Sequence, residues 1–355
     1  MLISVSQLPP QEINRPSAWI GEEMVKKKDQ WITELLPEEI SELEQVAQNF
    51  INNSIDLGTI TKINFPLPLL ETRLENIRNT LIQGRGFEVI RGLPVKSYSQ
   101  EMAATIFCGI GAYIGKAVSQ NAMGHILGHV RDIGADANDT NARIYQTSQR
   151  QTFHTDSADV VGLLCLKTAK EGGKSLLVST ETIYNKMNKI RPDLAALLFE
   201  PIATDRRGEV PEDEKPYFEI PIFNWYQGRL TGMYQRQYIE SAQRFPDAAR
   251  LTNKHIEALN LFDELANDPK LFLSMQLAPG DIQFVHNHSQ LHDRTGFIDW
   301  PEINKRRHLF RLWLSVPGDR PLPACFKQRF GSIQIGERGG IITRDTKLNV
   351  PLDYL

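Results

Sequence analysis

The sequence predicts an α+β fold, with helices packed on a β core whose later strands form a barrel or jelly roll. Two observations lead to this prediction. Amphipathic helical segments dominate roughly the first 115 residues, and strand-like runs dominate beyond about residue 140. No repeat, low-complexity tract or linker interrupts the 355 residues, so we expect one domain spanning residues 1–355.

The helices come first in the chain. Residues 31–50 are the first candidate, because apolar side chains recur near the helical period at Ile40, Leu43, Val46 and Phe50. Pro37 fits the first turn of this helix. A second amphipathic segment covers residues 69–82 and can end at Gly84, and a third helix is expected at residues 99–115.

Short strand-like runs follow, bounded by glycine, proline, asparagine and aspartate. The first lies between two glycines, at residues 86–92. The later ones span residues 159–166, 174–179, 217–222, 281–286 and 307–316. We expect helical insertions at residues 182–191 and 246–267.

Charge and cysteine content narrow the class of protein. A net charge of -3 gives no electrostatic reason to expect a nucleic acid or an anionic membrane as partner. The three cysteines, Cys108, Cys165 and Cys325, are too widely spaced for a disulfide framework or a zinc motif. The first residues do not read as a secretory signal, and no apolar run is long enough for a membrane span. We therefore expect a cytoplasmic protein.

The pair His154 and Asp156 is the first candidate for chemistry. Side chains at i and i+2 of a strand point the same way, so both can reach one metal ion. A second histidine from far along the chain, among His286, His288 and His292, would complete two imidazoles and a carboxylate. That set covers one face of an octahedral metal, as in non-haem Fe(II) oxygenases. The alternative is a surface or capping His/Asp pair.

Two arginines near the end of the chain suggest anion binding. In the run of residues 307–316, strand alternation puts Arg307 and Arg311 on one face. Two inward-facing arginines would be costly unless anions neutralised them, and a dicarboxylate cosubstrate with an acidic substrate would do so. The alternative is a solvated face with both arginines at the surface.

Four segments in this order resemble the taurine dioxygenase/2,4-D dioxygenase (TauD/TfdA-like) family of Fe(II)- and 2-oxoglutarate-dependent oxygenases. They are residues 153–156, 171–179, 291–297 and 307–314. Residues 84–94 also resemble an early strand of that family. The resemblance covers roughly residues 80–320 and implies a double-stranded β-helix (jelly-roll) core with surrounding helices. Residues 1–80 lie outside it, and we expect them to form a helical extension packed on the core.

The resemblance implies three iron ligands. His154 and Asp156 would be the first two, and His292 the third, because it stands in the Leu-His-x-Arg-Thr context of the family. Strand parity alone would favour His286 or His288. Both are expected instead to have a polar role beside the site.

The resemblance also implies residues for the cosubstrate and the substrate. Ser175 and Arg307 would bind 2-oxoglutarate, with Ser175 standing where relatives often carry threonine. Arg311 would contact an acidic group of the substrate, although the register leaves an exchange of roles between the two arginines open. Gln120 and Asn121 lie in a polar segment that relatives use for substrate contacts, and a plain loop is the alternative.

The implied reaction consumes 2-oxoglutarate and O2 and releases succinate and CO2. The expected outcome is hydroxylation of an unactivated C–H bond in a small polar carboxylate or amino-acid-like molecule, with desaturation and cyclisation as open alternatives. Two other functions compete with this one. They are a cupin-like metal-dependent isomerase or hydrolase, and a non-catalytic protein that binds a small molecule. The sequence makes no prediction of the oligomeric state.

Overall fold

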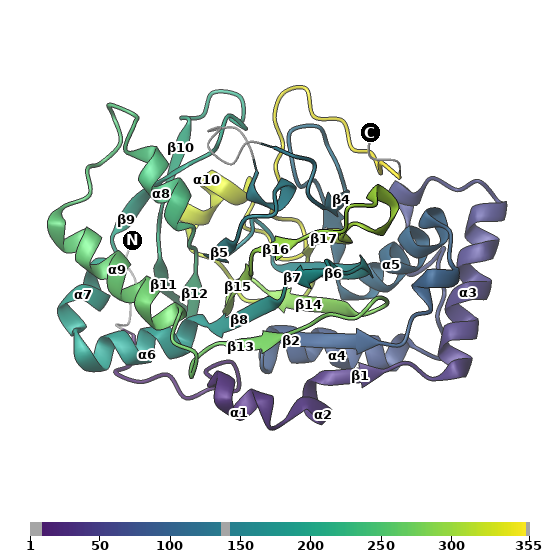
Figure 1. Cartoon of the computed structure of the whole chain (residues 1–355). Coiled ribbons are helices and arrows are strands. Elements are labelled where there is room, and N and C mark those ends of the chain that lie inside the picture. The colour runs from purple at the N-terminus through teal and green to yellow at the C-terminus, as the bar shows by residue number, and fades with distance from the viewer. Residues whose placement is uncertain (1–8, 136–142, 353–355) are drawn as a thin grey trace.

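The computed structural model describes residues 9–135 and 143–352. Figure 1 shows β-strands in the centre of the molecule, one group of helices on the right and another on the left. The expected combination of helices with a sheet-rich core is thereby confirmed. Among the described residues, no helix has both the length and the apolar character needed to cross a membrane.

The right-hand group contains the three helices expected in the first third of the chain. They are α3 (Pro37–Asn52), α4 (Glu71–Gln83) and α5 (Gln100–Ile114). Pro37 occupies the start of α3, where its missing N–H costs nothing. The Ser99 side chain accepts a hydrogen bond from Met102 N and so caps α5.

One expectation about the first helix is wrong. Residues 28–31 form the short helix α2 (Lys28–Trp31), but residues 32–34 form strand β1 (Ile32–Glu34) rather than a continuous helix. β1 pairs in parallel with β2 (Phe87–Arg91), with Ile32 opposite Val89. This pairing with a strand more than fifty residues away outweighs the local helical pattern.

Two sheets form the centre of the fold. The larger has seven strands in the order β1-β2-β14-β6-β17-β3, with β4 paired to β17. The smaller has four strands in the order β13-β8-β15-β5. Their remaining members are β3 (Lys116–Val118), β4 (Leu127–Val130), β5 (Gln151–His154), β6 (Val160–Lys167), β8 (Ser175–Ser179), β13 (Leu273–Met275), β14 (Ile282–His286), β15 (Gln290–Arg294) and β17 (His308–Ser315).

The other elements lie around these sheets. Three two-stranded pairs are β9 (Pro201–Asp205) with β10 (Tyr217–Pro221), β11 (Phe223–Tyr226) with β12 (Arg229–Gly232), and β7 (Glu171–Gly172) with β16 (Phe297–Ile298). The remaining helices are α1 (Gly21–Val25), α6 (Thr180–Ile190), α7 (Pro192–Leu197), α8 (Arg236–Ala242), α9 (Asn253–Ala266) and α10 (Lys327–Phe330). The helical insertion expected at 246–267 is therefore shorter than predicted, because α9 begins only at its Thr252 cap.

Three apolar clusters hold these layers together. One joins α3, α4 and α5 to the larger sheet and includes Leu43, Phe284 and Phe310. A second joins α6, α7 and α9 to the smaller sheet. The third contains side chains of both sheets, such as Leu177 and Val285, and so packs one sheet against the other. Members of this third cluster, such as Val161 and Leu309, also line a cavity that contains polar side chains.

Leu43 tests whether the early helices and the sheets unfold together. Its side chain is fully buried in the first cluster, so we expect Leu43→Ala to lower the free energy of unfolding by about 2–5 kcal/mol. The control is Ile63→Ala, because Ile63 is 93% exposed. Urea unfolding followed by circular dichroism and tryptophan fluorescence measures both. Non-coincident transitions, or equal stability of the two variants, would contradict this packing.

Candidate functional site

Strand pairing brings two distant histidines together. β5 and β15 run antiparallel, and His154 lies directly opposite His292, with ring centroids 4.1 Å apart. Asp156 follows β5, and its carboxylate oxygens lie 3.9 Å from His154 Nε2 and 3.5 Å from His292 Nε2. The three ligand atoms lie within 4.8 Å of one another, a spacing that suits a single metal ion.

The ring of His154 is oriented for ligation. Its Nδ1 lies 2.8 Å from the carbonyl oxygen of Thr152, so Nδ1 carries the proton and donates. That tautomer leaves a lone pair on Nε2, which is 2.9 Å from Nε2 of the Gln151 amide. Burial lowers the pKa of His154 to about 3, and the neighbouring His292 adds to this effect. His154 is therefore a neutral imidazole at neutral pH, the form that binds metal.

The carboxylate of Asp156 is held from several sides. Trp313 Nε1 donates to Oδ2 over 2.8 Å, and the backbone N–H of Asp156 donates to Asn287 Oδ1 over 3.0 Å. Arg311 Nη1 lies 3.7 Å from Oδ2. Burial alone would raise the pKa of Asp156, but Arg311 and the two histidines outweigh it and lower the pKa below the usual range. Asp156 is thus an ionised ligand.

The competing histidines lie in a separate buried cluster. His286 Nε2 is 3.0 Å from Asp319 Oδ1, and His288 Nε2 is 2.8 Å from Asp159 Oδ1. His286, His288 and Asp319 are close enough together to hold a metal ion. However, Arg338 donates to Asp159 over 2.7 Å and to Asp319 over 3.1 Å, so a cation is already present. This favours a structural ion network over a second metal site.

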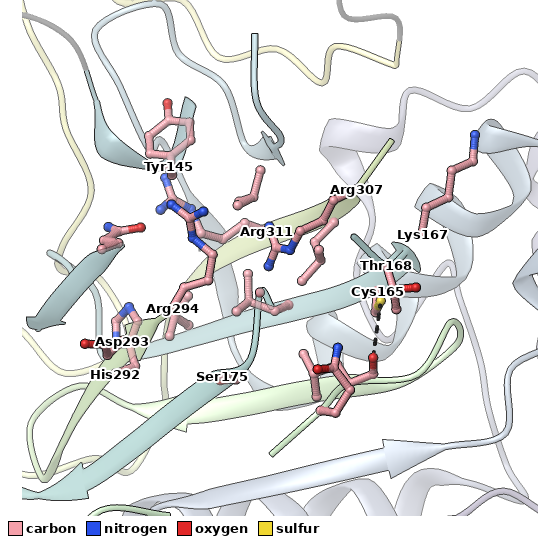
Figure 2. Close-up of a pocket in the computed structure, with 18 of the residues that line it drawn as sticks. Tyr145, Cys165, Lys167, Thr168, Ser175, His292, Asp293, Arg294, Arg307 and Arg311 are labelled. Atoms are coloured by element: carbon pink, nitrogen blue, oxygen red, sulfur yellow. Dashed lines mark hydrogen bonds between the residues drawn. The ribbon is translucent and has the colours of Figure 1, made fainter. Parts of the chain in front are cut away.

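A cavity opens beside His292, and buried arginines line it. Figure 2 shows Arg294, at the end of β15, and Arg307, just before β17, reaching into it on either side of Arg311. Burial lowers the pKa of Arg307 to about 10, and Nη1 of this side chain has no hydrogen-bond partner among the described residues. Gly173 leaves room for it, because a Cβ there would lie 3.0 Å from Arg307 Nε. A buried guanidinium with an unused donor fits a carboxylate ligand.

Sequence reasoning missed Arg294 as a lining residue. It stands two residues after His292 on β15 and shares its face, whereas Asp293 points away and binds Arg150. Burial, followed by the charge of Arg307, lowers the pKa of Arg294 to about 9. Its Nη2 donates to Gln149 O over 2.6 Å, but Nε and Nη1 have no partner among the described residues. Strand alternation from His292 was the signal that could have found it.

The structure places the predicted cosubstrate residue Ser175 in the wall of the same cavity. Its hydroxyl donates to Gln283 Oε1 over 2.9 Å. Arg307 itself precedes β17 by one residue, and the observed strand is one residue shorter at each end than the predicted run of residues 307–316. Its side chain nevertheless shares the cavity with Leu309 and Arg311, as alternation required.

Arg311 lines both this cavity and a second one, whose wall also contains Asp156. Its guanidinium lies over the rings of Tyr145 and Trp313, at 4.5 and 5.1 Å from their centroids. Nε donates to Gln120 Oε1 over 2.7 Å. Arg311 is therefore positioned to contact ligands in either cavity.

Gln120 and Asn121, the two residues predicted to contact the substrate, lie in different surroundings. Gln120 lines the second cavity, but its amide already bonds Arg311 and the carbonyl oxygens of Ile126 and Arg311. Asn121 lies outside the linings of both cavities. Its side chain accepts from His125 N over 3.2 Å, which favours the alternative of a plain loop residue.

Comparisons with known proteins agree with this geometry. A family model described as "Taurine catabolism dioxygenase TauD, TfdA family" matches residues 47–313. FR-33289 synthase of Streptomyces rubellomurinus is 29% identical over 309 residues, covering 84% of this chain and 89% of that protein. A taurine hydroxylase-like protein of Stachybotrys chartarum is 30% identical over 311 residues, covering 85% and 79%.

Solved structures share the fold. Asparagine oxygenase in complex with Fe(II), 2S,3S-3-hydroxyasparagine and succinate superimposes with a TM-score of 0.58 at 16% identity, covering 80% of this chain and 93% of that one. The non-haem iron oxygenase OrfP in complex with Fe and alpha-ketoglutaric acid gives 0.58 at 14% identity, with the same coverage. The chain therefore belongs to the TauD, TfdA family and is a 2-oxoglutarate-dependent non-haem iron oxygenase, for which Fe(II), 2-oxoglutarate and O2 are the cofactor and cosubstrates.

Proposed function

We propose that His154, Asp156 and His292 hold the iron and that the enzyme hydroxylates an unactivated C–H bond of a small anionic molecule. The observation that carries this proposal is the cluster of three ligands between two cavities. Three protein ligands on one face of the metal leave positions for the cosubstrate and for O2. Iron and 2-oxoglutarate supply the oxidising chemistry when bound, and the protein positions the reactants.

In this proposal the cavity beside His292 receives 2-oxoglutarate. Arg307 pairs with the distal carboxylate, and its unused Nη1 donor supports that role. Arg294 adds a second buried positive charge nearby, and Ser175 lines the same cavity, where its hydroxyl would turn from Gln283 Oε1 to donate to a carboxylate oxygen of the cosubstrate. Apolar walls such as Val161 and Leu309 exclude bulk water from the reacting centre.

The substrate binds in the cavity beside Asp156, where Arg311 faces it. An anionic group on the substrate would complement this arginine, whose Nε is already fixed by Gln120. Asparagine oxygenase holds a hydroxylated amino acid and succinate in its structure, which supports hydroxylation of a small polar molecule here too. Succinate and CO2 would be the other products.

We also propose that the two sheets wind as a double-stranded β-helix and that residues 1–355 act as one domain. The support is the apolar cluster shared by both sheets and the cluster that joins α3 to the larger sheet. Residues 9–80 would then be an extension, helical apart from the strand β1, that stabilises the core, and residues 1–8 of the predicted extension lie outside the described residues.

His292 and His288 make a matched pair for testing the iron ligands. We expect His292→Ala to abolish Fe(II) binding and succinate formation with little change in melting temperature, because open-site ligands serve catalysis more than stability. His288→Ala should lower the melting temperature, because it removes one buried partner of Asp159 and leaves a cavity beside that ion pair network. Iron content after anaerobic loading, succinate release and thermal unfolding are the measurements. Retained iron in His292→Ala, with iron lost in His288→Ala, would reverse the assignment.

Arg307 is tested through the affinity for 2-oxoglutarate. Arg307→Ala would leave one carboxylate unpaired in a buried pocket, a loss on the order of 2–5 kcal/mol. We expect a large rise in the KM for 2-oxoglutarate with Fe(II) affinity unchanged. Arg311→Ala is the control and should change this KM far less. The opposite pattern in the two variants would mean that their roles are exchanged.

A further inference from the structure

The second cavity is unusually rich in positive charge. Arg143, Arg311 and Arg329 all line it, and among the described lining residues Asp156 is the one carboxylate. That carboxylate belongs to the proposed iron site, so it is committed to the metal and its ligand shell. An ammonium group of a substrate would therefore find no acidic partner in the described wall, whereas an anion would find several cations.

Arg329 is the cation with the least compensation. It comes from α10, is 9% exposed, and its Nε donates to Ser157 Oγ over 2.6 Å. Its guanidinium lies over the ring of Phe218, at 5.4 Å from the centroid. Within residues 9–135 and 143–352, no carboxylate forms an ion pair with it, and Asp156 attracts it only at longer range.

The surroundings of Arg329 are those of an anion site. Burial lowers its pKa to about 9, and the nearby charges of Arg143 and Arg206 contribute to this effect. Arg143 is better compensated, since it is ion-paired with Glu209 and donates to Tyr238 Oη over 2.9 Å. Arg329 is mostly buried and forms no ion pair among the described residues, and a bound oxyanion would offset the cost of burying its charge.

We propose that Arg329, together with Arg143, binds a dianionic tetrahedral group of the substrate, a phosphate monoester or a phosphonate. This inference rests on the proposed function, because it names the substrate class of the same site. Guanidinium groups from different segments can donate to the several oxygens of such a group, and Arg311 adds a third positive charge in the same wall, whereas a carboxylate has only two oxygens and one charge. Ser157, next to Asp156 in the chain, anchors Arg329 close to the metal, so the anion would fix the substrate beside the reacting centre.

Calorimetric titration of the anaerobic protein loaded with Fe(II) and 2-oxoglutarate tests the proposal. Loading fills the iron and the cosubstrate cavity, so the probes can bind only elsewhere. The probes are methyl phosphate, methylphosphonate and acetate, at a pH where the first two are dianions. We expect at least one dianion to bind much more tightly than acetate, and the tighter one identifies the source of the group. Equal binding of acetate, or no binding of either dianion, overturns the proposal.

Matched variants locate the site. Arg329→Gln should weaken dianion binding by about 10-fold or more, and Arg329→Lys should fall between, because lysine keeps the charge but lacks the planar fork. Arg191→Gln is the control, since Arg191 is ion-paired with Asp193 and Glu257 beside α7 and α9. Unchanged dianion binding in Arg329→Gln overturns the assignment. If that variant does not fold, Arg329→Lys and Arg143→Lys give the same comparison.

Dianion binding and iron binding are separate measurements, so this inference and the proposed function can fail independently of each other. Dianion binding requires no turnover, so its loss in Arg329→Gln with normal 2-oxoglutarate affinity concerns the substrate class alone. Failure of His292→Ala to lose iron would instead concern the metal site and leave the anion measurements intact.

Discussion

The antiparallel pairing of β5 with β15 is the constraint on which the rest of the site depends. It sets His154 opposite His292, although the two residues are far apart in the chain. The same register puts Arg294 on the cavity side and sends Asp293 to Arg150. A slip of one residue would exchange these faces and separate the ligands, because side chains alternate along a strand.

Asp156 connects the metal ligands to the substrate side through a set of buried contacts. Trp313 and Arg311 both approach it from β17, and alternation along that strand places them on one face. Gln120 in turn fixes Arg311. The proposed iron ligand and the proposed substrate contact are therefore parts of one network.

A second buried network of ion pairs joins the segment after β17 to Asp159, three residues beyond Asp156. Arg338 bonds Asp159 and Asp319, and His288 bonds Asp159 as well. Gly340 N donates to Ser157 O over 2.7 Å, so the segment after β17 returns to the residues that follow Asp156. Because the segment after β17 folds back in this way, Arg329 lies in the wall of the second cavity. The charges of this network are paired, which contrasts with the uncompensated guanidinium of Arg329.

The sequence by itself determined what depends on short spacing. The helical period predicted α3 and α4, and strand alternation placed His154 with Asp156, two residues apart, and Arg307 with Arg311, four residues apart. The family resemblance predicted an oxygenase rather than an isomerase or a binding protein, and the family match confirms this prediction. The resemblance pointed to His292 among the three nearby histidines, whereas strand parity favoured the other two, because cross-strand register is set by pairing between distant segments and not by local spacing. Tertiary structure alone decided that Arg294 and Arg329 are buried without a carboxylate, since compensation of a charge depends on contacts from remote parts of the chain and not on its neighbours in sequence.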